Sequence, residues 1–188
     1  ALTEKYLKDQ FDSNLNGSNV IILGGTGPVG VASAVICAKA GSNVTLVGRN
    51  IEKAEKIAGI CNERYQSKNI KGGADADKSD YFKTADVVLN TGAAGIQLMT
   101  DDHISMSSSL KICADTNAVP PSGIAGVDVM DNGKAIEKSP NGCVGIGALA
   151  IGNIKYKSQH ECLKLMYTSE KPVYLDFEDA FKFAQKSV

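Results

Sequence analysis

Short apolar runs, each followed by a glycine-rich or polar turn, recur along the chain. Within each run apolar residues follow one another without alternation, which is typical of strands that are buried on both faces of a parallel sheet. We therefore expect buried strands at Asn19–Leu23, Asn43–Val47, Asp86–Leu89, Leu110–Ala114 and Cys143–Ile146.

Apolar residues at helical spacing lie between and after these runs. They predict helices over Thr3–Phe11, Pro28–Ala40, Ile51–Tyr65, Ala148–Tyr167 and Asp176–Gln185. The turn sequence Asp131-Asn132-Gly133 predicts a hairpin between Val127–Met130 and Lys134–Ile136. Strands that alternate with helices indicate an α/β fold, with a doubly wound, mostly parallel Rossmann-like sheet and helices on both faces.

The same pattern predicts how the chain divides. We expect residues 1–16 to form a linking helix, residues 17–170 the Rossmann domain and residues 171–188 a C-terminal helical segment. A length of 188 residues suits one main domain of this kind.

Composition narrows the function classes. The net charge of -1 and the lack of tryptophan argue against nucleic-acid binding, which needs basic surface or stacking rings. No apolar run is long enough to span a membrane and no signal peptide is recognisable, so we expect a cytoplasmic protein. The five cysteines include no Cys-x-x-Cys pair and there are only two histidines, so we expect reduced thiols and no metal site.

The strongest local motif is Gly25-Thr26-Gly27-Pro28-Val29-Gly30, which matches G-x-G-x-x-G between a predicted strand and a predicted helix. In a dinucleotide-binding unit the first glycine permits the tight turn, the second lets the backbone approach a pyrophosphate, and the third allows close helix–strand packing. The alternative is a plain glycine-rich turn without a ligand.

The residues after the second predicted strand bear on which dinucleotide is bound. NAD-binding domains usually carry an acidic residue there, which accepts from the ribose 2′-hydroxyl. Here the strand is followed by Arg49 and Asn50, with Lys53 one turn further. A guanidinium pairs with a 2′-phosphate, so the pattern favours NADP. The alternatives are that Arg49 and Lys53 are ordinary surface cations and that Asn50 caps the next helix.

Two further turns follow predicted strands at the sheet edge where ligands of α/β proteins bind. Thr91, Gly92 and Ala93 form a turn of small residues that leaves room for the nicotinamide ribose, although a purely structural turn remains an alternative. Asn117 could bond to a ribose or a carboxamide, or could instead have a structural role.

Five blocks of sequence together resemble one known family. They are GGTGPVG at Gly24–Gly30, VGRN at Val47–Asn50, TGAAG at Thr91–Gly95, ADTNAVPPSGIAGVD at Ala114–Asp128 and GALAIGNIKYK at Gly147–Lys157. The chain is similar, from about Gly17 to its end, to bacterial NADP-dependent methylene-tetrahydromethanopterin dehydrogenases, whose members also act on methylene-tetrahydrofolate. The last two blocks are the more specific ones.

The resemblance implies an oxidoreductase of one-carbon metabolism. Its members oxidise the methylene bridge of a reduced pterin to the methenyl form, with hydride transfer to NADP. A lysine of the family's active site corresponds to Lys155 here. A cation beside the forming cationic product would be unfavourable, so we expect Lys155 to hold a pterin carbonyl or to act as an uncharged amine. The alternative is an ordinary surface lysine on a helix.

The family also has an N-terminal domain that forms the other wall of the pterin cleft, and the matching blocks here do not include it. The chain is then either the C-terminal part of a longer enzyme, or a free-standing NADP-binding domain whose second wall comes from another subunit or which lacks catalysis. We expect a homo-oligomer or pairing with that domain. A different NADP oxidoreductase of shikimate-dehydrogenase-like architecture is the third alternative.

Overall fold

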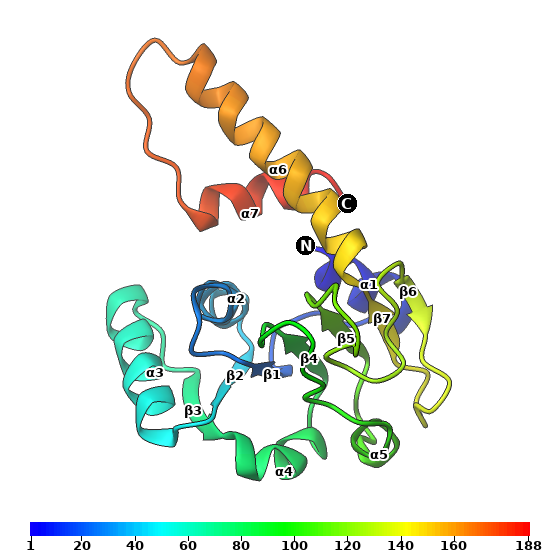
Figure 1. Cartoon of the computed structure of the whole chain (residues 1–188). Helices are drawn as coiled ribbons and strands as arrows, with labels where there is room; N and C mark the ends of the chain where they lie inside the picture. The colour runs from blue at the N-terminus through cyan, green and yellow to red at the C-terminus, as the bar shows by residue number, and fades with distance from the viewer.

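The computed structural model describes all 188 residues, Ala1–Val188, and contains one seven-stranded sheet (Figure 1). The strand order is β3-β2-β1-β4-β5-β7-β6, and every neighbouring pair is parallel except β6 with β7. The strands are β1 Asn19–Leu23, β2 Asn43–Gly48, β3 Ile70–Ala74, β4 Val87–Asn90, β5 Ile112–Asp115, β6 Asn132–Ala135 and β7 Val144–Ile146. The predicted fold class is confirmed.

Helices cover both faces of this sheet. They are α1 Leu2–Phe11, α2 Pro28–Lys39, α3 Ile51–Tyr65, α4 Lys78–Phe82, α5 Asp101–Met106, α6 Ala148–Thr168 and α7 Phe177–Gln185, with a 3-10 turn at Asp75–Asp77. Residues of α1, α2 and α3 share one apolar cluster, whereas Phe82 of α4 and Ile104 of α5 belong to a second one. The two clusters are the cores on the two sides of the sheet.

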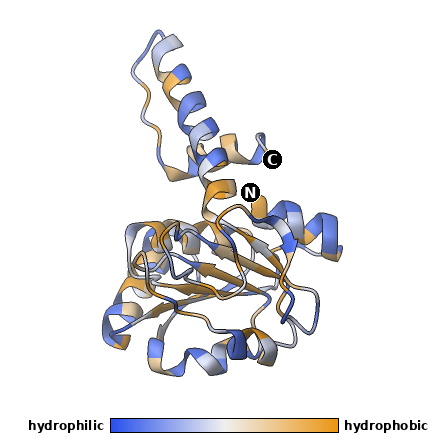
Figure 2. Cartoon of the chain, turned by 45° about the vertical axis from the view of Figure 1, so that its right-hand side comes forward, coloured by the Kyte–Doolittle hydropathy of each residue, from blue (hydrophilic) through white to orange (hydrophobic).

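The sequence of β1 explains why its apolar run does not alternate. Val20 and Ile22 belong to the first cluster, whereas Ile21 and Leu23 belong to the second. Side chains of successive residues point to opposite faces of a strand, so both faces must be apolar when both are covered. Figure 2 shows these hydrophobic strands between helices whose outer sides are more hydrophilic.

Helix α1 is part of the first core. Its Leu7 is completely buried, and its Tyr6 hydroxyl donates to the carbonyl oxygen of Asn132 in β6 at 2.8 Å. Burying a leucine of this kind contributes roughly 1.5–3 kcal/mol, so α1 stabilises the core that it packs into. The predicted boundary after residue 16 stays a prediction.

Helix α6 projects beyond the body of the molecule, and the following segment returns so that α7 lies back across its base (Figure 1). Lys39 of α2 pairs with Glu178 of α7 at 2.6 Å, and the rings of Tyr65 and Phe177 meet edge to face with centroids 5.9 Å apart. These contacts join α7 to α2 and α3. The outer half of α6 is uncovered, with Leu163 65% and Tyr167 91% exposed.

Several sequence-based expectations differ from the structure. The hairpin prediction is wrong, because Val127–Met130 forms no strand and Asn132–Ala135 pairs instead with Val144–Ile146. Asp128 and Asp131 fold that stretch into a turn. The N–H of Met130 donates to the Asp128 carboxylate at 2.9 Å, and the N–H of Asp128 donates to the Asp131 carboxylate at 2.8 Å. Strand β3 and the short helices α4 and α5 were not expected, and the other element ends shift by at most two residues.

Candidate functional site: the carboxyl edge of β1, β2, β4 and β5

Strand β1 is the point at which the order of strands in the sheet changes direction. From β1 the chain adds β2 and β3 on one side and then β4 and β5 on the other. The loops that follow β1 and β4 therefore diverge at this point, which is where open α/β sheets bind ligands. The two loops are nonetheless tied at their bases, because both the N–H and the hydroxyl of Thr91 donate to the carbonyl oxygen of Leu23 at 2.9 Å.

Three glycines of the first loop are required by the protein's own packing. Gly24 has a φ of +66°, and a Cβ there would lie 2.5 Å from Cα of Gly92. A Cβ at Gly25 would lie 2.7 Å from Cδ2 of Leu46, and one at Gly30 would lie 2.5 Å from Cα of Gly25. Gly25 and Gly30 thus serve the tight turn and the close approach of α2 to β1, as the motif predicts.

Gly27 differs from the other glycines of the motif. It is the N-cap residue of α2 with a φ of -86°, and a Cβ there would meet only the Gly24 carbonyl oxygen at an ordinary 3.6 Å. Neither backbone strain nor internal packing requires a glycine at this position. What it leaves open is the space at the start of α2, where a phosphate would approach the backbone.

The same helix start presents unused hydrogen-bond donors. The backbone N–H groups of Thr26, Val29 and Gly30 donate to no acceptor of the protein. Unpaired N–H groups and the positive end of the helix dipole together favour an anion. Because these N–H groups are unpaired and lie at the start of α2, the residues of the glycine motif fit a dinucleotide pyrophosphate.

The side chains that would select the nucleotide lie at the carboxyl end of β2. Arg49 and Lys53 are exposed and form no ion pair within the chain. Their neighbour Gly48 lies against the glycine loop, since a Cβ there would lie 2.8 Å from Cγ2 of Thr26. Arg49 and Lys53 follow Gly48 closely in sequence, and Gly48 lies against Thr26 of the glycine loop. Because neither cation is in an ion pair, both are free to bind an anion.

Asn50 acts as the N-cap of α3. Its Oδ1 accepts the N–H of Lys53 at 2.7 Å. The capping alternative is therefore realised in the structure. A contact between Asn50 and a cofactor stays a prediction. It would have to come from Nδ2, because Oδ1 is engaged in the cap.

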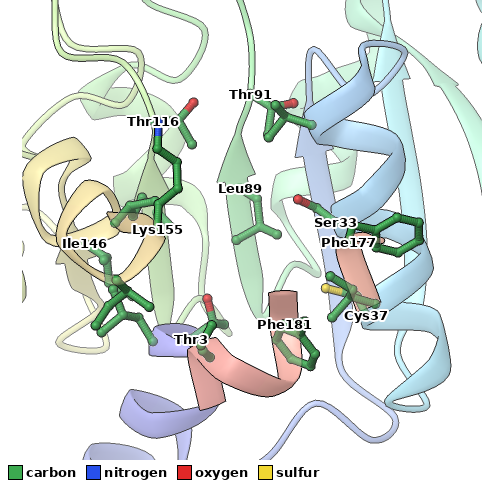
Figure 3. A pocket seen from close by; sticks show the side chains of 18 of the residues that line it. Thr3, Ser33, Cys37, Leu89, Thr91, Thr116, Ile146, Lys155, Phe177 and Phe181 are labelled. Atoms are coloured by element: carbon green, nitrogen blue, oxygen red, sulfur yellow. The ribbon is translucent and has the colours of Figure 1, made fainter. Parts of the chain in front are cut away.

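A pocket of about 340 Å³ lies between α2 and α6, and Val29 of the glycine motif is among its lining residues (Figure 3). Helix α2 forms one wall and α6 the other, β4 and β5 lie between them, and α7 crosses the cavity. Lys155 reaches in from α6 with its amine toward Thr116, and Thr91 lies on the opposite side. Lys155 is the only charged side chain in a lining that is otherwise mostly apolar and whose uncharged polar residues are Thr3, Ser33, Asn90, Thr91, Thr116 and Ser158.

The loop after β5, which contains Asn117, is held by its own hydrogen bonds. Asn117 is 5% exposed, its Oδ1 accepts from the N–H groups of Gly95 and Val119, and its Nδ2 donates to Pro121 at 2.8 Å. These contacts favour the structural alternative for Asn117, and a bond to the cofactor stays a prediction. Thr91 lines the pocket, Gly92 lies against Gly24 of the first loop, and Ala93 next to them is exposed. The role of these three residues at the nicotinamide ribose stays a prediction.

Ser79 and His103 resemble a nucleophile with its base, but their hydrogen bonds exclude that role. The N–H of Thr100 donates to Nδ1 of His103 at 3.1 Å, so Nδ1 carries no proton in the neutral ring. Nε2 then carries the proton and donates it to the Ser79 hydroxyl at 3.0 Å. His103 completes a capping box with Thr100 at the start of α5, which is a structural role.

The capping role makes stability depend on pH. Burial, followed by the nearby Lys78 charge, lowers the pKa of His103 below its ordinary 6.5, so the folded state favours the neutral ring. The stability that the cap contributes is complete above pH 6.5 and is lost as the pH falls through the lowered pKa of His103. We expect urea unfolding to show a loss of stability from this cap as the pH falls from neutral to acidic. His103→Gln, which keeps an acceptor at this position, should lack this component; an identical pH profile for both proteins would contradict the assignment.

The cysteines and histidines form no cluster with other ligand residues. No group of three or more His, Cys, Asp or Glu side chains is arranged to hold a metal ion. Burial raises the pKa of Cys37 to about 12. The buried Cys113 and Cys143 lie with their sulfurs 3.6 Å apart, and the thiol hydrogen bond between them, followed by burial, raises the pKa of Cys113. Such thiols are poor nucleophiles and poor ligands.

Comparison with known proteins supports the resemblance seen in the sequence blocks. No protein-family model matches the chain. The chain is 36% identical over 187 residues to the NAD(P)-dependent methylenetetrahydromethanopterin dehydrogenase of Methylorubrum extorquens, a match that covers 98% of this chain and 62% of that protein. The predicted family resemblance is confirmed. The bifunctional protein MdtA of the same organism is 35% identical over 176 residues, covering 92% of this chain and 59% of MdtA.

The chain thus spans about three fifths of the length of these two relatives. Among solved structures, quinate dehydrogenase from Corynebacterium glutamicum in complex with NAD matches the whole chain with a TM-score of 0.60 at 14% identity, over 61% of its own length. That likeness shows the fold. No helix of the chain combines the length and the apolar character needed to cross a bilayer.

Proposed function

We propose that this chain binds NADP at the carboxyl edge of its sheet and takes part in the oxidation of methylene-tetrahydromethanopterin, or methylene-tetrahydrofolate, to the methenyl form. The observation that carries the proposal is the glycine loop, where packing requires Gly25 and Gly30 but neither packing nor φ requires a glycine at position 27. The similarity to the Methylorubrum extorquens dehydrogenase supports the choice of reaction.

The residues divide between two tasks. The free N–H groups of Thr26, Val29 and Gly30 would hold the pyrophosphate, and Arg49 with Lys53 the 2′-phosphate. Bound NADP would supply the acceptor for a hydride. The chain's own contribution is then to place the substrate, and orientation of this kind supplies up to roughly 7–11 kcal/mol.

Lys155 would bind the substrate in the apolar pocket. An ammonium group at the rim donates to a carbonyl oxygen of a flat heterocycle, while the apolar lining covers the ring. Loss of hydride from the methylene carbon leaves a positive charge shared by two nitrogens, so no base is obligatory. Lys155 therefore acts by holding the substrate at a distance from that forming charge, since two cations in contact repel.

The test of the proposal is a direct assay. Purified chain is mixed with NADP and methylene-tetrahydromethanopterin, and the absorbance of NADPH and of the methenyl product is followed. Turnover supports the proposal. Binding of NADP without turnover, with either pterin or folate substrate, would favour a non-catalytic NADP-binding domain or one that needs a second wall. No binding of NADP would contradict the proposal outright.

Replacing Lys155 with alanine should lower turnover on the order of 100-fold, because a substrate misplaced by about 1 Å reacts that much more slowly. The affinity for NADP should stay within about twofold of the wild type, because Lys155 contacts substrate rather than cofactor. Where the chain alone does not turn over, the same variant is read by titration of substrate binding.

The control is Lys157→Ala, an exposed lysine two residues along α6 that does not line the pocket. It should behave as the wild type in both measurements. Parallel loss of NADP affinity in Lys155→Ala would instead mean a cofactor-binding or structural role.

We further propose that the chain associates with a second copy or with a further domain, as its relatives' greater length allows. The uncovered apolar side chains of α6, including Leu149, Tyr156 and Leu163, support this. The mass of the native protein in solution distinguishes a second copy from a further domain as the partner that covers these side chains.

A further inference from the structure

One buried carboxylate at the carboxyl edge has no assigned role. Asp115, the last residue of β5, is 1% exposed and pairs with no lysine or arginine. Its charge is held by four N–H donors instead. Oδ2 accepts the backbone N–H groups of Gly123 and Ile124 at 2.7 and 3.0 Å, and Oδ1 accepts that of Asn117 at 2.9 Å.

The fourth donor connects Asp115 to the neighbouring strand. Asn90, the last residue of β4, stands opposite Asp115 in the strand register and donates its Nδ2 to Oδ1 at 2.7 Å. The other end of the Asn90 amide, Oδ1, accepts the N–H of Gly92 at 3.0 Å. Asn90 and Asp115 together therefore join the loop after β4 to the loop after β5.

The packing around this pair leaves little freedom. Asn90 is completely buried, and a Cβ at Gly123 would overlap its Nδ2 and lie 2.9 Å from Oδ1 of Asp115. The residue facing these donors must be an acceptor only, because four N–H groups converge on its two oxygens. An ionised carboxylate meets that need, whereas an amide would present its own NH₂ to some of them.

The position of the pair relative to the glycine loop indicates what it serves. Arg49 and the 2′-phosphate side lie on the β2 side of β1, whereas Asn90 and Asp115 end the two strands on the opposite side. A dinucleotide whose pyrophosphate lies over Gly27 would extend its other half toward β4 and β5. Asn90 also lines the pocket into which Lys155 reaches.

We propose that Asp115 is the positioning residue for the nicotinamide half of the cofactor, acting through Asn90. It holds the loops at Thr91–Gly92 and at Asn117 at the separation that admits the nicotinamide ribose, and it contacts neither cofactor nor substrate. This inference rests on the proposed binding of NADP and adds the group that orders one half of that site.

The experiment compares two ligands that share one half. Calorimetry measures the Kd of NADP and of adenosine 2′,5′-bisphosphate, which lacks the whole nicotinamide mononucleotide half, including one phosphate of the pyrophosphate. In Asp115→Asn the Kd of NADP should rise about tenfold or more, while that of the bisphosphate stays within about twofold of the wild type. A residue that supports only the fold would move both ligands together or neither, so the difference between them is the readout.

A second variant and a matched control keep the outcome decisive. Asn90→Ala removes the link but leaves Asp115 three backbone donors, so it tests the same selective loss should Asp115→Asn fail to fold. Asp86→Asn is the control, because Asp86 accepts from Asn19 and Lys111 at the opposite edge of the sheet. It should lose stability without a selective loss of NADP.

Equal losses of both ligands in Asp115→Asn and Asn90→Ala, or no loss in either variant, would overturn the inference while leaving the proposed function standing. A wild-type chain that bound neither ligand would instead overturn the proposed function itself. The two failures are therefore distinguishable in one set of titrations.

Discussion

Gly27→Ala should raise the Kd of NADP by about 100-fold or more, equivalent to at least about 2.7 kcal/mol, while the protein folds normally. The added methyl group has room within the protein, since its nearest neighbour is the Gly24 carbonyl oxygen at 3.6 Å. The φ of -86° is also accessible to alanine. The methyl group instead fills the space in which a pyrophosphate would meet the free N–H groups at the start of α2. Calorimetric titration with NADP, together with a thermal melt, measures both effects.

The matched variant is Gly30→Ala, which adds the same methyl group three residues further along the chain. Its Cβ would lie 2.5 Å from Cα of Gly25, so α2 must move away from β1 and the protein should lose about 1–3 kcal/mol of stability. The two variants therefore separate a ligand requirement from a packing requirement. Normal NADP affinity in Gly27→Ala would show that the pyrophosphate is not held at this loop.

The buried strands were the most predictable part of the fold. In β1 and β5 alternate residues enter the two opposite cores, as with Ile112 and Cys113, so the strand had to be apolar throughout. An uninterrupted apolar run followed by glycine or a polar residue then locates the strand to within two residues. The predicted doubly wound sheet follows from these runs because parallel strands need covered faces.

Strand β3 escaped prediction for a physical reason. Its sequence is Ile-Lys-Gly-Gly-Ala, and glycine is disfavoured within strands. Here the glycines allow close packing, because a Cβ at Gly72 would overlap the backbone of Glu55 in α3 and one at Gly73 would lie 2.8 Å from a ring carbon of Tyr81. Such a requirement depends on the neighbour across the interface and leaves no local pattern in the sequence.

The candidate site was only partly predictable. The glycine motif and Arg49 are local signals, and the structure places them at one edge. The pair Asn90–Asp115 depends on the register between β4 and β5, which no local pattern contains. A usable signal was nevertheless present, since each of these polar residues directly ends a buried apolar run. Lys155 could be indicated only by family resemblance, because the helix that carries it reaches the pocket through tertiary packing.

Arg49→Asp should weaken NADP by about 10–100-fold, because hydrogen bonds to a charged group contribute about 1.5–3 kcal/mol and Arg49 is the nearest cation to the end of β2. The aspartate would also repel a 2′-phosphate. Binding of NAD should be unchanged or tighter, since a carboxylate at this position accepts from a ribose 2′-hydroxyl. Titration with each dinucleotide at one fixed ionic strength gives the selectivity ratio, and that ratio should shift toward NAD.

Lys56→Asp is the control for the change in net charge, because it replaces an exposed cation of α3 one turn beyond Lys53 with the same acid. A long-range charge effect would weaken NADP similarly in both variants and would fall as salt is added. Contact between Arg49 and the 2′-phosphate predicts instead that only Arg49→Asp changes the ratio strongly and that much of the change survives in salt. Equal losses of NADP and NAD in Arg49→Asp would mean that the residue holds the cofactor without distinguishing the two, and the specificity of the site would then have to come from elsewhere on the edge.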